Sequence, residues 1–207
     1  MNAKNHHRIT TQALEKRVSP AALKTIIAAN LGQDAIRYQI GHEHFHYDNS
    51  SFQAGDMYLV KMRRAVMDAL EDDQVAPAWQ AFGRLLHAAQ DFYAHSNYIA
   101  LWCEYHPGAA PDQTPPLLAD VLTDSRLHSG RLYYPLEFLS FIPVLRPLVL
   151  PFLPRDAHAW MNKDDPSRPG FDFAYAAAVK RTRLEFQKVI QALSPAQARL
   201  FTGKSSI

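Results

Sequence analysis

A row of three side chains that can bind metal ions constrains this sequence more than any other feature. His87, Asp91 and His95 stand four residues apart within residues 83–98, whose apolar spacing predicts one long helix. At 3.6 residues per turn, the row drifts by only about 40° per step and stays on one face. Its neighbours are mostly apolar, and burying ionisable groups without partners is unfavourable. The row therefore predicts a metal centre inside a helical fold.

The length of this row indicates more than one ion. At about 1.5 Å per residue, His87 and His95 lie roughly 12 Å apart along the helix axis. A zinc–nitrogen bond is only about 2.0–2.1 Å long, so one ion is not expected to bind both. The simplest arrangement places Asp91 between two metals, with one histidine on each. The competing interpretation is structural, since His–Asp pairs four residues apart also occur as ordinary surface or half-buried pairs.

A second cluster precedes the row. His42, His44 and His46 alternate and are followed by Asp48. In an extended backbone these side chains would point to one side, and aromatic neighbours indicate that the segment is anchored. Asp48 is the best carboxylate candidate to complete a metal site with oxygen ligands. The alternative is a solvated polar loop.

Other candidates are weaker on their own. His6 stands near the start of the first expected helix, and His158 closes a proline-rich region, with Asp164 six residues later. A single cysteine, Cys103, is predicted to be a packed thiol. Ten histidines with one cysteine favour nitrogen and oxygen ligands over thiolates. His106 and His128 lack patterned neighbours and are interpreted as loop residues.

Helical periodicity dominates the chain and predicts an all-α fold of one domain over residues 1–207. Eleven prolines interrupt the region from about 107 to 170, which is predicted to be irregular and lid-like. Residues 38–56 are polar and turn-like. The expected helices cover about 9–18, 20–31, 56–71, 77–104 and 173–193, with a short last one opened by Ser194 and Pro195.

Charge and hydropathy limit the classes of partner that the chain is expected to bind. The formal charge is +2 and the basic residues are scattered, so nucleic acid is an unlikely partner. The first residues lack the apolar core of a secretory signal, which predicts a cytoplasmic chain or one exported without a conventional signal peptide. The apolar stretch 133–154 contains five prolines and is not expected to span a membrane. It could instead be core, a lid or membrane-contact surface, or a partner-binding segment.

Three motifs resemble one known family. Residues 87–98 resemble the signature of the fungal Het-C domain and its bacterial relatives, and residues 46–49 and 161–169 resemble two further blocks of it. The resemblance runs from His6 to about Phe186. These domains are similar to the superfamily of zinc-dependent phospholipase C and fungal zinc nucleases, which are all-α proteins with three clustered zinc ions. The resemblance therefore implies zinc as the cofactor, with up to three ions.

The resemblance also implies a role for each candidate. His6 would bind one zinc, His87 would join Asp48 at a second, and Asp91 would bridge. His95 and His158 would hold the third, and Asp48 would also orient the attacking water as the catalytic residue.

The sequence departs from the family pattern at three points. Met1 replaces an N-terminal tryptophan whose amine and carbonyl bind zinc, and it could chelate through its backbone atoms. A histidine expected between Asp48 and His87 is missing, so His46 or His44 would substitute. Asn162 stands where an acid is expected, so Asp164 would serve.

On this basis the sequence predicts a zinc-dependent phosphoric ester hydrolase, similar to phospholipase C, which uses a metal-activated water. Its substrate would be a phospholipid or another phosphoester, with residues 133–154 in contact with the membrane. The alternative is a non-enzymatic, metal-stabilised Het-C-like module that binds a membrane or a partner. A nuclease relative is a third and weaker interpretation, because no aromatic and basic stripe is present.

Overall fold

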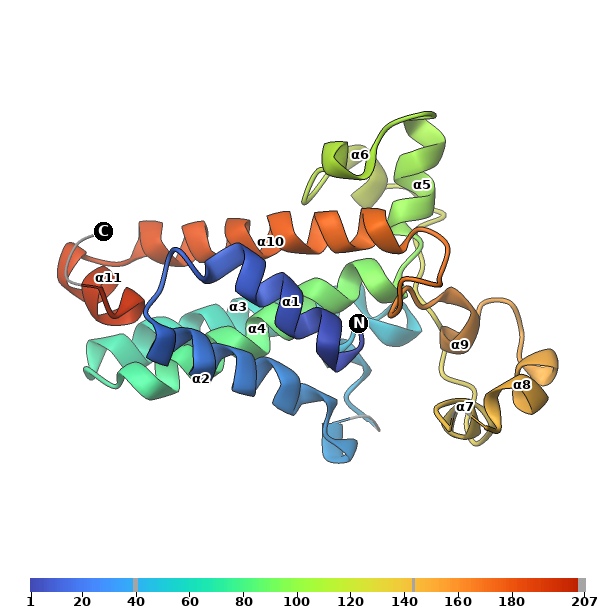
Figure 1. The fold of residues 1–207 in the computed structure, drawn as a ribbon, viewed down its shortest axis with the longest axis horizontal. Coiled ribbons are helices and arrows are strands. Elements are labelled where there is room, and N and C mark those ends of the chain that lie inside the picture. The colour runs from blue at the N-terminus through green and yellow to red at the C-terminus, as the bar shows by residue number, and fades with distance from the viewer. Residues whose placement is uncertain (39–40, 143, 205–207) are drawn as a thin grey trace.

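Helix α4 (Val75–His95) is the centre of the molecule, and three long helices pack around it: α2 (Pro20–Leu31), α3 (Phe52–Glu71) and α10 (Phe171–Ala192). The computed structural model describes residues 1–38, 41–142 and 144–204. Helix α1 (Ala3–Leu14) packs on α10 and α2, and α11 (Pro195–Thr202) closes the far end of the bundle (Figure 1). The predicted all-α class is confirmed.

The remaining helices are short. Five are α-helical, namely α5 (Tyr98–Tyr105), α6 (Ala119–Leu122), α7 (Leu136–Ser140), α8 (Arg146–Val149) and α9 (His158–Met161). Within the described residues, six 3₁₀ turns complete the set: Gly32–Asp34, Ile36–Tyr38, Glu43–Phe45, Asp48–Ser50, Pro111–Gln113 and Leu150–Phe152. Across the described ranges the only extended pairing consists of two isolated bridges, Ser96 with Ser129 and Arg131 with Ala157.

Local signals fix where the long helices begin. Ser19 accepts a hydrogen bond from the Ala22 amide, and Pro20 fills the first turn of α2 as predicted. The predicted start of the first helix at Ile9 is wrong. Helix α1 begins at Ala3, because the Asn2 side chain caps it by accepting from the Asn5 amide at 3.0 Å. This earlier start places His6 inside the helix.

Helix α4 is buried on almost every side at its C-terminal half, as a central helix must be. Gly83 allows the closest approach, because a Cβ atom there would lie 2.3 Å from the Ile26 carbonyl oxygen of α2. The side chains on the other faces of α4 fill the core between α3 and α10, with Phe82, Leu85, Leu86 and Tyr93 fully buried.

The prediction of one continuous helix over 77–104 is wrong. The chain breaks at Ser96, whose backbone is extended, and α5 begins at Tyr98. The Asn97 amide donates to the His128 carbonyl at 2.9 Å, and the Asn97 side chain accepts from the His128 amide at 2.9 Å. The bond from the Asn97 amide replaces the helical one that this amide would have made within a continuous helix, whereas the Ser96 amide still donates to the Phe92 carbonyl. As a result His95 lies at the C-terminus of α4, beside the loop that carries residue 130.

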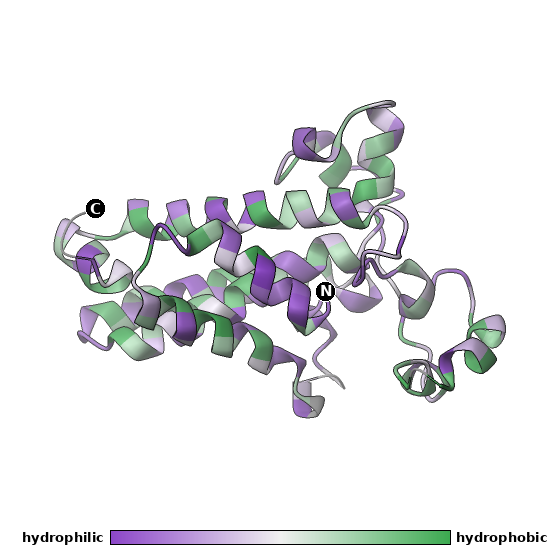
Figure 2. Cartoon of the chain, in the orientation of Figure 1, coloured by the Kyte–Doolittle hydropathy of each residue, from purple (hydrophilic) through white to green (hydrophobic). Residues whose placement is uncertain are grey.

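The proline-rich region forms a separate projection. Residues 133–142 and 144–154, called the lobe from here on, contain α7 and α8 and extend away from the bundle (Figure 1). Val149 and Leu153 form a small core of their own with Ala157 and Ala159. The lobe has a high content of apolar residues (Figure 2), and several of their side chains are exposed. In the described part of the chain, no helix combines the length and hydropathy that crossing a membrane requires.

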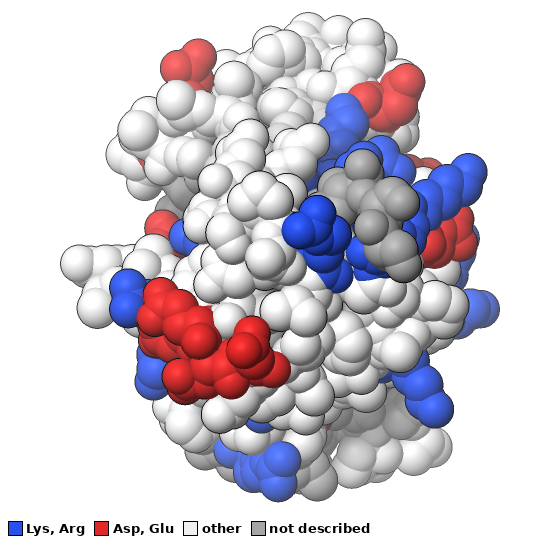
Figure 3. Space-filling model, turned by 90° about the vertical axis from the view of Figure 1, so that its left-hand side faces the viewer, with Lys and Arg blue, Asp and Glu red and all other residues white. Residues whose placement is uncertain are grey.

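The end of the bundle opposite the lobe carries charges of both signs. Figure 3 shows acidic side chains gathered on this face with basic ones nearby. Helix α3 ends here in an acidic run, Glu71, Asp72 and Asp73, all exposed. The face is therefore not a uniformly basic surface of the kind that binds nucleic acid.

Candidate metal centre

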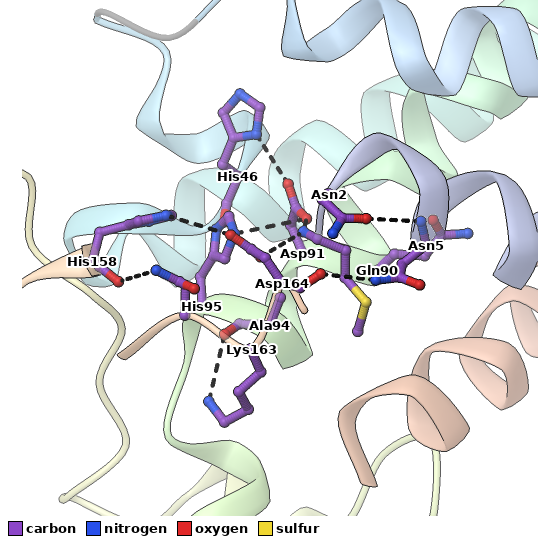
Figure 4. Close-up of polar contacts among 12 residues, drawn as sticks. Asn2, Asn5, His46, Gln90, Asp91, Ala94, His95, His158, Lys163 and Asp164 are labelled. Atoms are coloured by element: carbon purple, nitrogen blue, oxygen red, sulfur yellow. Dashed lines mark hydrogen bonds and ion pairs between the residues drawn. The ribbon is translucent and has the colours of Figure 1, made fainter. Parts of the chain in front are cut away.

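The structure gathers the predicted site residues at one end of α4. His6 comes from α1, His46 and Asp48 from the turns before α3, and His158 and Asp164 from α9 and the loop after it. All of them except Asp164 are at least nine-tenths buried. Figure 4 shows His46, Asp91, His95, His158 and Asp164 directed towards one region. Their ligand atoms form three groups within metal-binding distance: His6, Asp34 and His87; His46, His87 and Asp91; and Asp48, His95 and His158.

The first two groups share His87 and make one centre around Asp91. The Nε2 atom of His87 lies 3.0 Å from one Asp91 oxygen, and His46 Nδ1 lies 3.0 Å from the same oxygen. His6 Nε2 lies 3.1 Å from the other oxygen. Asp34 reaches the edge of this centre, 3.6 Å from His87 Nε2. His87 faces both groups with the same nitrogen, Nε2, and one nitrogen lone pair can bind only one ion. The two groups therefore form a single site for one ion.

Hydrogen bonds on the outer side fix which nitrogen of His6 faces the centre. Gln90 donates from its amide nitrogen to the hydroxyls of Thr10 and Thr182, at 3.1 and 3.0 Å. Its oxygen must therefore accept, and it lies 2.6 Å from His6 Nδ1. His6 thus carries its proton on Nδ1 and points the lone pair of Nε2 at Asp91. Metal-ligating histidines are held in this way by an acceptor behind them.

His87 is arranged similarly. Its Nδ1 atom lies 3.4 Å from the Asn30 side-chain oxygen, which leaves Nε2 towards Asp91. Burial lowers the pKa of His87 to about 4, so the ring is neutral at pH 7. Burial and the nearby Met1 amino group also lower the pKa of His6. Two neutral nitrogen lone pairs therefore converge on a carboxylate, an arrangement that a bound cation stabilises.

The second centre lies around His95. Its Nδ1 atom is 3.3 Å from Asp48 and 2.9 Å from the His46 carbonyl oxygen. The other nitrogen, Nε2, is 3.3 Å from Asp164. His158 Nδ1 lies 2.9 Å from the same Asp48 oxygen. The resemblance paired Asp48 with His87, whereas the structure groups Asp48 with His95 and His158.

The carboxylates of both centres are held ionised. Burial opposes the charge of Asp48, but His158 and His95 outweigh it and keep the pKa of this carboxyl below its usual value. Burial also opposes ionisation of Asp91, and the Met1 amino group and His87 hold its pKa well below the usual range. The Met1 amino group contacts Asp91 and lies 3.1 Å from Asp164. These ionised, buried carboxylates favour the binding of a cation at the site.

The pKa of His95 is shifted in the opposite direction from that of His87. Burial opposes its positive charge, but Asp91 and Asp48 outweigh this effect and raise the pKa of His95 well above its usual value. Without a metal, His95 therefore carries a proton that a metal ion would displace.

Strained backbone places His46 and Asp48. Tyr47, Asn49 and Ser50 all have φ near +55°, in the left-handed region that such residues rarely adopt. The Tyr47 hydroxyl donates to Asp56 at 2.7 Å. The Tyr47 ring also packs against Gly55 so closely that a Cβ atom at position 55 would lie only 2.7 Å from it. The expectation of an extended 42–48 segment is therefore wrong. The chain turns, so His46 and Asp48 enter the site while His42 stacks on Phe45.

Gly130 connects the segments that carry the second centre. Its amide donates to the His95 carbonyl and its carbonyl accepts from the Asn49 amide, both at 2.9 Å. The next residue, Arg131, accepts from the His158 amide at 2.9 Å. A Cβ atom at position 130 would lie 2.6 Å from the His158 Cα, so only glycine permits this packing.

Replacing Gly130 by alanine is expected to lower both stability and metal affinity. The added methyl group must displace the His158 backbone, and overpacking of this kind costs about 1–3 kcal/mol. Chemical denaturation measures the first effect and zinc titration the second. Gly32→Ala is the matched control, because nothing lies within 4 Å of its added Cβ. Equal zinc affinity in the two variants would show that Gly130 does not position the centre.

Some residues were missed or placed differently from the sequence analysis. Asp34, in the turn after α2, was missed, because an acid after a helix end carries no specific signal. Asn162 caps α9 by donating to the His158 carbonyl at 2.9 Å, while Asp164 reaches the site.

His44 packs against Phe45 and Tyr58 instead of joining the centre. His106 stacks on Trp102 and His128 binds Asn97, both away from the site.

A pocket of about 420 Å³ opens onto these residues. Its polar side is formed by the ligand candidates of both centres, including Asp91, His95 and Asp164. Its apolar side is formed by residues of the lobe, Tyr134, Phe138 and Phe141. With cations bound at the polar side, the arrangement would accommodate a ligand that has an anionic part and an apolar part.

Buried polar atoms without hydrogen-bond partners mark the site further. They include His6 Nε2 and His46 Nε2. Orphaned buried nitrogens of this kind are rare unless an ion or a water molecule satisfies them. With several imidazoles and carboxylates and no thiolate, the donor set fits zinc or a similar first-row divalent ion.

Fold and site together define an all-α domain with a buried histidine and aspartate cluster beside an apolar projection. The profile of the VWA7 N-terminal domain matches residues 3–121. The chain belongs to this family. The match includes all the site residues except His158 and Asp164.

The curated relatives agree with this family. The chain is 35% identical over 81 residues to von Willebrand factor A domain-containing protein 7 of Mus musculus. The same protein of Homo sapiens is 35% identical and that of Rattus norvegicus 33%. These alignments cover 39% of this chain and 9% of each relative. No solved structure matches the chain.

The match to the VWA7 N-terminal domain contradicts the family resemblance predicted from the sequence. The resemblance to the Het-C domain and the zinc-dependent phospholipase C superfamily is wrong, because the signature at residues 87–98 lies within the stretch that matches the VWA7 N-terminal domain. The predicted zinc-dependent phospholipase C-like hydrolase rested on that resemblance and is wrong for the same reason, as are the Het-C-like module and the nuclease relative. A short metal-capable motif on a buried helix can recur in different families.

Proposed function

We propose that this domain binds divalent metal ions, with zinc as the preferred ion, at two neighbouring centres. The first uses His6, His46, His87 and Asp91, with Asp34 at its edge. The second uses Asp48, His95 and His158, with Asp164 beside it. A third ion would have to share donors with these two.

One observation carries this proposal. His6 directs a neutral, unpartnered Nε2 atom at Asp91, and Gln90 behind it fixes that orientation. A buried nitrogen lone pair beside a carboxylate is unfavourable unless a cation lies between them. His87 also directs its Nε2 atom at Asp91, at 3.0 Å, and this atom lies 3.1 Å from His46 Nδ1, so the three imidazoles can share one ion.

The pocket suggests what the metal-loaded domain recognises. Metal ions bind phosphoryl oxygens, and the pocket places both centres opposite aromatic side chains of the lobe. We infer that a phosphoester anion, such as a phospholipid headgroup, binds here as a ligand.

Metal analysis of the purified chain tests the proposal. The protein is stripped with a chelator, dialysed against zinc and measured by atomic emission. We expect two bound ions per chain, and one ion after Asp48→Asn. Asp68→Asn removes a half-exposed carboxylate that pairs with Arg64 on α3 and is the matched control. Glycerol phosphate should bind the zinc-loaded chain in a calorimetric titration and fail to bind the stripped one.

The proposal is contradicted if the chain retains no more zinc than the variant that carries both Asp48→Asn and Asp91→Asn. Zinc binding without glycerol phosphate binding would retain the metal centres and reject the phosphoester ligand.

A further inference from the structure

The lobe exposes an unusual concentration of large apolar side chains. Of the fourteen large hydrophobic residues that are exposed in the described chain, nine lie on the lobe. Val144, Phe152 and Leu148 are the most exposed of these, at 76%, 74% and 68%. Scattered single residues of this kind need no explanation, but a contiguous apolar group marks an interaction surface.

These exposed residues are not required to hold the lobe together. Its inner side is fixed by Val149 and Leu153, which pack against α9. Polar contacts add to this attachment: Glu137 accepts from the Ala159 amide at 2.6 Å, and Arg146 donates to the Ala159 carbonyl at 3.2 Å. The outward apolar side chains are therefore available for a partner.

The charges of the lobe and its edge indicate the chemistry of that partner. Glu137 is the only acid between residues 133 and 155, and it is fully buried. The other charged residues are Arg146 and Arg155, and Arg155 lies over the Trp160 ring at 4.2 Å. The accessible surface thus combines apolar side chains with the exposed guanidinium of Arg155. The nearest partly exposed carboxylate, Asp156, accepts from the Tyr133 hydroxyl at 3.0 Å and lies 3.9 Å from Arg131. This combination complements the anionic headgroups and acyl chains at a lipid surface.

The shape of the lobe favours a bilayer over a folded protein surface. It projects from the bundle as a narrow tip (Figure 1), which can enter the region between headgroups and acyl chains. Phe138 and Phe141 belong to both the lobe and the pocket wall, so an inserted lobe would turn the pocket towards the headgroups.

We propose that the lobe inserts into the interfacial region of anionic phospholipid bilayers and docks the domain there. Leu148, Phe152 and Phe141 enter the acyl-chain boundary, and the exposed Arg155 contacts phosphate groups. This docking depends on the lobe and not on metal binding, so the two proposals can fail separately.

Vesicle sedimentation tests the proposal on the full chain. The vesicles contain phosphatidylcholine alone or phosphatidylcholine with about 30% phosphatidylserine. We expect binding to the anionic vesicles, weakened by more than about 10-fold in the double variant Leu148→Ser with Phe152→Ser. The matched control is Met57→Ser with Val60→Ser, which replaces two residues of α3 that are 66% and 60% exposed. The control should bind as the original chain does, and circular dichroism and zinc content should be unchanged in both variants.

Three results would overturn the proposal: no vesicle binding by the original chain, equal binding by the lobe variant, or equal loss in the control. A dimer in light scattering that the lobe variant loses would assign the surface to a second copy instead. If the chain binds vesicles but retains no zinc, the metal proposal is contradicted and the docking proposal is retained.

Discussion

Replacing Asp91 by asparagine is expected to reduce zinc affinity by more than about 100-fold, since losing even an outer partner of a metal ligand costs about 10–100-fold. Asp91 is the one residue that His6, His46 and His87 all approach within about 3 Å. Asparagine keeps the size of the side chain and removes its charge. The measurement is competition of each variant with a chromophoric zinc chelator at pH 7.

The control for this experiment is again Asp68→Asn, which should leave zinc affinity unchanged. Circular dichroism of the metal-free proteins checks that Asp91→Asn still folds. A folded Asp91→Asn variant with the original zinc affinity would show that Asp91 is not a ligand.

Zinc is expected to raise the thermal stability of the chain strongly. At a free zinc concentration 1,000 times the dissociation constant, each site stabilises the folded state by about 4 kcal/mol. For a chain of this size, 1 kcal/mol shifts Tm by roughly 2–4 °C. One site should therefore raise Tm by roughly 8–16 °C, and two sites by about twice as much. Calorimetry with zinc and with a chelator measures the shift.

The variant with both Asp48→Asn and Asp91→Asn serves as the reference for that experiment. It should melt at the same temperature with zinc and with the chelator. If the original chain also shows no shift, zinc does not bind the folded state selectively, and the buried histidines have another role.

Much of the fold could be predicted because the long helices have local signals. Ser19 with Pro20 and Ser194 with Pro195 define helix starts that the structure reproduces. The break at Ser96 could not be predicted, because it depends on hydrogen bonds between Asn97 and His128, 31 residues later. The same applies to the turn at Tyr47, which depends on packing against Gly55 and on Asp56.

The site was predictable where its residues share one helix. His87, Asp91 and His95 follow from helical spacing alone, and burial distinguishes this row from a surface pair. Asp34 and the supporting Gln90 could not be found in this way. Their roles depend on how α1, α2 and α4 pack, and a glutamine or an aspartate at such a position has no distinctive neighbours in sequence.

The family assignment failed for a related reason. A histidine and aspartate row on a buried helix reflects the geometry that metal ligation requires, so unrelated families can share it. The central motif therefore identified candidate ligands without identifying the family. Residues 122–207, which lie beyond the family match, supply His158, Asp164 and the lobe.

The most direct test is anomalous diffraction at the zinc absorption edge from crystals grown with zinc. We expect one anomalous peak among His6, His46, His87 and Asp91, and a second among Asp48, His95 and His158. Crystals of the zinc-saturated protein with no peak in this cluster, or with peaks only on the exposed surface, would contradict this expectation.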